Sequence, residues 1–405
     1  MPYWTGTSKP ILWGRVLIQS SQTMSRRLIF LILALLLLAP LAIPAKKKKK
    51  NTGVTTEEEG YVLPPIVDES AKKKKKKPED ETQVLPLPKE LPGIITGEVQ
   101  RLSFTVSPLS GRGLLSAQVR EALRATLAQN RGGTVLKIRA FVAGSGDLRR
   151  VGTLVSEIFT EKKLPLPVLT TVQVGALPLE NAQVVLESIS SDKRVLNENG
   201  LAFVSGQPTT TADPVTPLKK ALDRAGVTPN DVLRVTCFLN TYDKLGEVRH
   251  QITSAFPQAA PDFIQLQRGT IVDFVECEAV ASLKATPAKP LVMVDAQAGS
   301  YSQAALVAPG KIAISGEQLG FHQQDEDVKL AFERLGKTLE SAGANYRNTA
   351  FLHIYGLTRK AAEQIRTLRF GYVDKANPPA STLLLFEGLP SLDASFGLDV
   401  ITVIP

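Results

Sequence analysis

The sequence contains few of the residues on which metal and redox chemistry depend. Two cysteines and three histidines occur among its 405 residues. Two cysteines exclude a disulfide framework, and no Cys-x-x-Cys pair is present to hold zinc. His250, His322 and His353 lie far apart, without metal-ligand spacing. We therefore expect neither a metal nor a cofactor.

Motifs for nucleotide binding and for serine hydrolases are absent as well. The chain has no P-loop and no dinucleotide-binding glycine pattern. Ser205-Gly206-Gln207 and Ser315-Gly316-Glu317 are not the Gly-x-Ser-x-Gly turn that presents a nucleophilic serine. The sequence therefore gives no support to a nucleotide-dependent or a serine-hydrolase mechanism.

The excess of positive charge is confined to the N-terminal segment. The formal net charge is +9, but residues 1–90 hold 16 of the 48 basic and 9 of the 39 acidic residues. Residues 91–405 consequently have a net charge of +2. Such a body has no electrostatic feature that attracts DNA or RNA, so we expect no nucleic-acid partner.

The two cysteines, Cys237 and Cys277, both lie in apolar runs that are typical of strands. One interpretation is that they are small buried side chains. The other is a disulfide between them, which requires export of the body to an oxidising compartment.

A secretory signal peptide is expected from Met24 to Ala45, with Met24 as the true start. Arg26 and Arg27 precede an unbroken apolar run over 28–39, and small residues follow. This run is shorter than the ~20 residues that a membrane span needs. We therefore expect export to the periplasm or the extracellular space.

Lys46 to Lys50 favour a competing interpretation, because lysines tend to stay on the cytoplasmic side of a membrane. In that case the apolar run is an uncleaved membrane anchor. Blocks of lysine, glutamate and proline continue to residue 96, and such a stretch cannot bury enough apolar surface to become ordered. We expect a disordered tether, either simply solvated or in contact with a membrane or the cell envelope through its lysines.

The rest of the chain repeats one order of elements three times. In the third copy a turn at Pro309-Gly310 divides two strands, and apolar residues spaced by three and four predict a helix over 328–339. Gly343 ends this helix. The strand TAFLHIYGL, a second helix over 359–372, and the strands STLLLFEGLP and FGLDVITVI follow.

The second copy has the strand LAFVSGQP, a helix ending at Ala225-Gly226, the strand VLRVTCFL, a helix over 245–256 and the strand DFVECEAVAS. The first copy has QRLSFTVSP, a helix around Leu115 to Leu127, VLKIRAFV, a helix over 147–159, VLTTVQVGALP and VVLESIS. This alternation predicts an α+β module with a mixed sheet and two helices on one face. The expected ranges are 1–45 for the extension with signal peptide or anchor, 46–96 for the tether, and 97–190, 191–287 and 288–405 for copies one to three.

The third copy opens with GSYSQAALVAPGKIAISGEQ, which resembles the opening of proteins of the RidA/YjgF family. The second copy keeps only the end of this motif, Val204 to Pro208. DVLRVTCFLNTYDKLGEV and VLKIRAFVAGSGDLRRV resemble the family's central strand and the loop that follows it.

The resemblance implies a chorismate-mutase-like fold, and family members form homotrimers with pockets between subunits. Three copies in one chain would then form an intramolecular pseudo-trimer, with the chain itself a monomer. The physical logic is that each sheet has one face free of helices, and three such faces bury one another around a common axis. We therefore expect a small-molecule ligand in clefts between copies.

RidA-like enzymes hydrolyse enamines and imines such as 2-iminopropanoate, and an arginine in a Pro-Ala-Arg motif holds the substrate carboxylate. The corresponding residue here is Ser381 in the third copy, Leu169 in the first and Phe263 in the second. None of them holds a carboxylate as a guanidinium does. Arg268, expected on a nearby strand, either takes over this role or lies exposed on a sheet edge.

A family glutamate near the last strand positions water and transfers protons. It corresponds to Glu187, Glu278 and Asp399 in the three copies, and the family tyrosine corresponds to Tyr301. The three acidic residues are also compatible with a structural, hydrogen-bonded role. The candidate residues are thus Glu278, Glu187 and Asp399 for catalysis, and Tyr301, Ser381 and Arg268 for substrate binding.

Three functions are compatible with the sequence. The leading one is small-molecule binding between copies by a RidA-like protein that lacks the standard deaminase site. The first alternative is an active enamine/imine deaminase, a hydrolase, with a rearranged site. The second is a non-catalytic scaffold tethered at the cell envelope, which clefts filled by Leu169 and Phe263 would favour.

Overall fold

The computed structural model describes residues 88–269 and 272–405. The expected signal peptide and most of the expected tether lie outside these residues. The described residues all belong to one structural unit, which starts at Thr82. No helix within them has the length and apolar character needed to cross a membrane.

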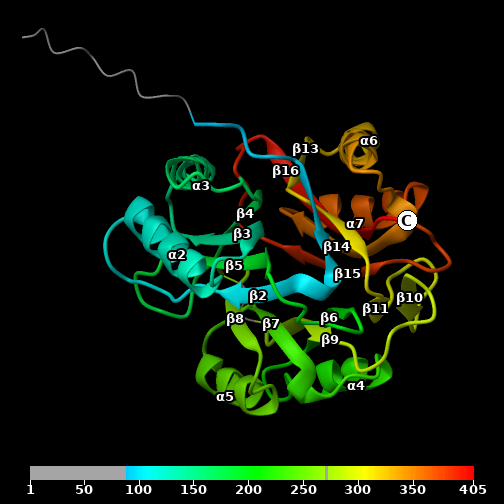
Figure 1. The fold of residues 1–405 in the computed structure, drawn as a ribbon. Coiled ribbons are helices and arrows are strands. Elements are labelled where there is room, and N and C mark those ends of the chain that lie inside the picture. Colours follow the sequence, from blue (N-terminus) through cyan, green and yellow to red (C-terminus); the bar gives the residue numbers. More distant parts are fainter. Residues whose placement is uncertain (1–87, 270–271) are drawn as a thin grey trace, which may run out of the picture. The chain divides into compact units, whose positions relative to one another are not determined.

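The fold contains three mixed sheets that share a strand order (Figure 1). In each, a central strand lies between an antiparallel last strand and a parallel edge strand, and the first strand pairs with the last. The first sheet is β2 (Leu102–Val106), β5 (Val184–Ser191), β3 (Thr134–Ala143) and β4 (Val168–Val174). The second contains β6 (Leu201–Thr209), β9 (Val275–Ser282), β7 (Val232–Leu239) and β8 (Ala260–Gln265). The third contains β12 (Lys311–Ser315), β16 (Ala394–Val403), β14 (Thr349–Gly356) and β15 (Ala380–Leu385).

Two helices accompany each sheet and lie at the periphery, with the strands between them (Figure 1). Their apolar stripes pack on the outer face of the sheet, as Val119, Leu222 and Phe332 do in the three cases. The helices are α2 (Leu115–Gln129), α3 (Arg149–Glu161), α4 (Thr216–Arg224), α5 (Leu245–Ala255), α6 (Asp325–Ser341) and α7 (Arg359–Leu368). Short 3-10 turns are η1 (Val99–Arg101), η2 (Pro229–Asp231), η3 (Tyr346–Asn348) and η4 (Arg369–Gly371).

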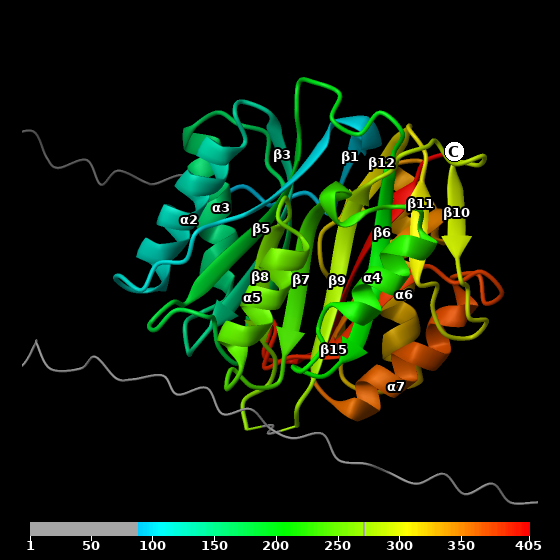
Figure 2. The same ribbon diagram turned by 90° about the horizontal axis from the view of Figure 1, so that it is seen from below.

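Some strands join a sheet formed by another part of the chain. β1 (Ile94–Glu98) pairs with β12 of the third sheet, although the next strand, β2, belongs to the first. β10 (Leu291–Val294) and β11 (Ala304–Val307) extend the second sheet beside β6 (Figure 2). β13 (Gln318–Phe321) pairs with β16. The expected tether boundary at residue 96 is therefore wrong, because β1 already begins at Ile94.

The inner faces of the three sheets meet in the middle of the fold. Residues of all three pack into one apolar cluster around Phe203 and Phe351, and into another around Phe238 and Phe386. At the boundaries between sheets, β2 contacts β8, β6 contacts β15 and β12 contacts β4. These three boundaries therefore bring together corresponding strands of different sheets.

Cys237 and Cys277 occupy paired positions on β7 and β9, and they form a disulfide. Both are fully buried against helices α4 and α5. Of the two interpretations left open by the sequence, the structure has the bridge.

Candidate functional site

A layer of charged side chains lies between the two central apolar clusters. Residues alternate between the two faces of a strand, so on β3 Lys137 and Arg139 point inward, while Ile138 and Ala140 face the helices. The register places Arg139 opposite Glu187, Thr236 opposite Glu278, and His353 opposite Asp399. The central charged layer, as it is called below, consists of Lys137, Arg139, Glu187, Arg234, Glu278, His353 and Asp399.

Arg139 is the hub of the central charged layer. Its Nε donates to Glu187 Oε2 at 2.7 Å, and its Nη2 donates to Glu278 Oε1 at 2.6 Å. Its Nη1 lies 2.8 Å from His353 Nε2. Because a guanidinium only donates, this contact requires Nε2 to accept, so the proton of a neutral His353 sits on Nδ1. Nδ1 lies 2.9 Å from Asp399 Oδ1 and donates to it.

Asp399 is the second anchor of the layer. Lys137 Nζ lies 2.7 Å from its Oδ1, and the hydroxyls of Thr170 and Tyr355 donate to its Oδ2 at 2.8 and 2.9 Å. Burial opposes ionisation of Asp399, but Lys137 and His353 outweigh it and hold the pKa of Asp399 far below its usual range. The same competition, with Arg139 as the main partner, strongly lowers the pKa of Glu278.

This geometry engages all three candidate catalytic carboxylates in ion pairs, and only Glu278 keeps an oxygen, Oε2, that is buried without a partner. Glu187, Glu278 and Asp399 are at most 3% exposed, and three cations balance their three negative charges. Buried ions of this kind persist because each has partners, and losing one partner is costly. The arrangement can fix the relative position of the three sheets, because its ion pairs join strands of different sheets.

The candidate binding residues Ser381 and Tyr301 lie elsewhere, where β6 meets β15. Ser381 N donates to Ser205 Oγ at 2.8 Å, and Ser205 Oγ donates to Ser302 O at 2.6 Å. Gly206 N donates to Thr382 Oγ1 at 3.2 Å. These contacts join the end of the second-copy motif to β15 and to the loop that carries Tyr301. The boundary formed by Ser205, Gly206, Ser302, Ser381 and Thr382 is called the β6–β15 seam below.

Glu276 belongs to this seam, and sequence reasoning missed it. It lies on β9 two residues before Glu278, and its carboxylate rests on Gly206, where an added β-carbon would be 2.0 Å from Oε1. Burial, and after it the charge of Glu276, raises the pKa of Tyr301. Among the described residues, no hydrogen bond or ion pair reaches the Glu276 carboxylate. Burial, with repulsion from Glu278, raises its pKa to about 8.

A signal for Glu276 was present in the run Val-Glu-Cys-Glu. Residues i and i+2 of a strand share a face, so Glu276 and Glu278 both point inward. The pattern does not reveal which of them meets a cation, because Arg139 comes from a different sheet.

The β12–β4 boundary is arranged differently. The acidic residue at this boundary is Glu317, and its carboxylate packs against Gly397 of β16. Thr171 N donates to Glu317 Oε2 at 3.3 Å, while Oε1 is buried without a partner. Burial raises the pKa of Glu317 to about 8. Leu169, at the position of the family arginine, supplies only backbone groups here, with its carbonyl accepting from Glu317 N.

In the second copy, the residue that corresponds to the family arginine was misassigned. Strand register places Leu169 opposite Ile138, Ser381 opposite Leu352, and Pro261, not Phe263, opposite Val235. The side chain of Phe263 is buried in the cluster under α5. The loss of the arginine in this copy stands, but the residue in its place is Pro261.

Arg268 follows β8 and lies in a turn, not on a strand. It is exposed, its Nε donates to Gly175 O at 2.6 Å, and its backbone N–H donates to Glu387. These contacts tie together the ends of the edge strands. The Arg268 guanidinium is thus bonded at the end of β4, and among the described residues no hydrogen bond joins it to Ser381.

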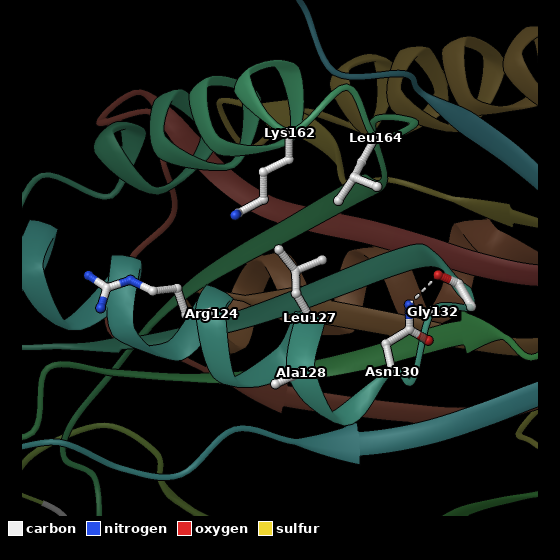
Figure 3. Close-up of a pocket in the computed structure, with 8 residues that line it drawn as sticks. Arg124, Leu127, Ala128, Asn130, Gly132, Lys162 and Leu164 are labelled. Carbon is white, nitrogen blue, oxygen red and sulfur yellow. Dashed lines mark hydrogen bonds between the residues drawn. The ribbon is translucent and has the colours of Figure 1, made fainter.

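A surface pocket of about 300 Å³ lies between the C-terminal ends of α2 and α3 (Figure 3). Arg124, Leu127 and Lys162 line it, and Asn130 stands at its floor with its Nδ2 bonded to Gly133 O. It contains none of the residues that the sequence indicated.

Comparison of the sequence with protein-family models and with curated proteins gives no match. Parts of the structure are similar to solved structures described as RidA or YjgF proteins. RidA from Psychrobacter sp. is 15% identical and covers 23% of this chain and 80% of its own, with a TM-score of 0.22. Rv2704 of the YjgF/YER057c/UK114 family, from Mycobacterium tuberculosis, is 16% identical and covers 28% of this chain and 99% of its own, with a TM-score of 0.22. The Rid-family protein YyfB from Yersinia pestis is 14% identical and covers 28% of this chain and 99% of its own, with a TM-score of 0.25.

Proposed function

We propose that the folded part of this chain binds a small molecule at the β6–β15 seam, with Glu276 as the group that gives or takes a proton. The observation that carries this proposal is the half-buried Glu276 carboxylate, which lies against Gly206 without a hydrogen-bonding partner among the described residues. A carboxyl that is largely withdrawn from water and that no cation neutralises remains protonated at neutral pH and can act as an acid. In the central charged layer, by contrast, Glu278 and Asp399 are held ionised by their cationic partners.

The architecture behind this proposal is a pseudo-trimer of three copies of one RidA-like module. Support comes from the shared strand order, from the corresponding positions of Arg139, Thr236 and His353, and from the cyclic contacts β2–β8, β6–β15 and β12–β4. Sedimentation should then show the full chain as a monomer. A stable homotrimer would contradict this part of the proposal.

Hydrolysis of an enamine or imine at the same seam is the second candidate function. It is favoured by the raised pKa of Glu276, because a carboxyl with a pKa of about 8 can protonate a substrate at neutral pH. Ser381 lacks the positive charge of the family arginine, so the substrate would have to be held by another group.

The test is hydrolysis of 2-iminopropanoate by the full chain, compared with Glu276→Gln and with Glu247→Gln, an exposed glutamate on α5. Turnover that falls ~10²–10⁴-fold only in Glu276→Gln would establish the hydrolase. No turnover, but pyruvate binding that Glu276→Gln alters, would establish a binding protein. Neither turnover nor binding would refute the proposal and favour the scaffold. Glu278→Ala is unsuitable as the test variant, because it disrupts the central charged layer.

Export remains part of the proposal. The Cys237–Cys277 disulfide supports it, since such bonds persist in oxidising compartments. Cell fractionation should find the body outside the cytoplasm, and an uncleaved membrane-bound form would favour the anchor.

A further inference from the structure

Arg369 is a buried cation without an anionic partner. It begins the turn η4 directly after α7, and it is only 4% exposed. Among the described residues, no carboxylate forms an ion pair with it. Its Nε is buried without any hydrogen-bonding partner. Burial, with repulsion from Arg366, lowers its pKa to about 10.

The groups that Arg369 does contact are neutral: its guanidinium lies over the ring of Phe370, 4.9 Å from the ring centroid, and its hydrogen bonds go to the β6–β15 seam. Its Nη1 donates to Ser381 Oγ at 3.3 Å, and its Nη2 donates to the carbonyl of Ser300. Ser381 is the residue at the motif position from which the arginine is missing. A guanidinium has thus reached this position from a different element.

The Ser300 carbonyl belongs to the loop 295–303, which connects β10 to β11 and covers Arg369. Gly299 N donates to Lys375 O at 2.9 Å, and Ser302 Oγ donates to Pro378 O at 2.5 Å. Gly299 has φ +75°, a conformation that other residues adopt at a cost. The loop therefore bridges the second sheet and the segment before β15, held by a few hydrogen bonds.

A buried guanidinium bonded only to neutral oxygens has unused capacity for an anion. A carboxylate forms two parallel hydrogen bonds with it and neutralises its charge, which a backbone carbonyl cannot do. Two such oxygens would satisfy the orphaned Nε together with one Nη group. Since no carboxylate of residues 88–269 and 272–405 forms an ion pair with Arg369, a ligand is the source of an anion for it.

We propose that Arg369 is the anion-binding residue of the β6–β15 seam, and that a small monocarboxylate displaces the Ser300 carbonyl from it. This inference rests on the proposed function and names its ligand class. The 295–303 loop moves when the ligand enters, and Ser381 Oγ remains as a neighbouring hydrogen-bonding group. A purely structural Arg369, which only fastens the loop to β15, is the competing explanation.

The inference is tested by calorimetric binding of pyruvate, and of its uncharged methyl ester, to the full chain. The variants are Arg369→Gln, Arg369→Lys and, as matched control, Arg359→Gln, whose parent arginine is exposed at the start of α7. We expect Arg369→Gln to weaken pyruvate binding at least tenfold and to leave binding of the ester unchanged. The pyruvate affinity of Arg369→Lys should lie between those of Arg369→Gln and the parent chain, and Arg359→Gln should match the parent chain.

Nitrogen-15 spectra of the arginine Nε–H groups provide a readout that needs no variant. The Arg369 resonance should shift with pyruvate and not with the ester, which a structural role does not predict. Equal pyruvate binding by Arg369→Gln and the parent would overturn the inference and leave the seam as a binding site. Binding of neither pyruvate nor ester to the parent would overturn it too, while 2-iminopropanoate turnover lost in Glu276→Gln would still uphold the proposed function.

Discussion

Glu276 and Glu278 are two residues apart on the same face of one strand, and they have opposite properties. Glu278 meets Arg139 at 2.6 Å and stays ionised, whereas Glu276 lies against Gly206 and holds its proton. The difference arises from the sheets opposite them, since β9 presents both side chains on the same face. The ion pairs of the central charged layer join the sheets, while the β6–β15 seam contains a neutral carboxyl and a cation, Arg369, that has no anionic partner among the described residues.

The largest effect should come from breaking the hub of the central charged layer. Arg139→Met removes the partner of Glu187 and Glu278, leaving buried negative charge, and should lower the free energy of unfolding by about 3–5 kcal/mol. Denaturant unfolding measures this loss, with Arg366→Gln as the control. A loss below about 1 kcal/mol would contradict the hub role.

A direct comparison of the two glutamates should give the next largest effect. Glu278→Gln weakens a charge-assisted hydrogen bond with Arg139 and should cost about 1.5–3 kcal/mol of unfolding free energy. Glu276→Gln should change it little at pH 6, because the native carboxyl is already neutral. Equal losses of unfolding free energy in the two variants would contradict the difference in charge between Glu276 and Glu278.

The pH dependence of stability sharpens the same comparison. Glu276 has its pKa raised from 4.5 to about 8 on folding, so between these values the folded state keeps a proton that the unfolded chain releases. Stability should therefore fall as pH rises through this window. The pKa values of Glu317 and Asp262 are also raised on folding, so these groups change stability with pH in the same direction. Unfolding free energies between pH 5 and 8 should fall less steeply in Glu276→Gln; identical slopes would contradict a neutral Glu276.

The smallest effect concerns the hydrogen bonds that close the seam. Ser205→Ala removes the hydroxyl that accepts from Ser381 N and donates to Ser302 O. The expected loss is about 1–2 kcal/mol, since a buried N–H is left without a partner. Thermal unfolding of this variant beside Ser341→Ala, on the exposed end of α6, provides the measurement. No difference between the two would mean that the seam is already solvated.

The sequence by itself determined the local elements, because they follow from spacing within short segments. The helix expected over 328–339 lies within α6, and the helix over 359–372 corresponds to α7 with η4. Strands such as VLRVTCFL and FGLDVITVI lie on β7 and β16. Mixed sheets with α+β character follow from the same patterns. The pairing of β1 with β12 of the third sheet could not be predicted, because strand partners far apart in the chain leave no local trace.

Only the tertiary structure decided what the charged residues do. Glu187, Glu278 and Asp399 were chosen by motif position, and the motif gave no sign that Arg139 and Lys137 of β3 would be their partners. Glu276 and Arg369 went unnoticed, since nothing within β9 or η4 distinguishes them from ordinary polar residues. The properties of an ionisable group depend on burial and on the charges within a few ångströms. Arg139 and Lys137 reach Glu278 and Asp399 from another sheet, so the charge states of these two carboxylates are set when the sheets meet.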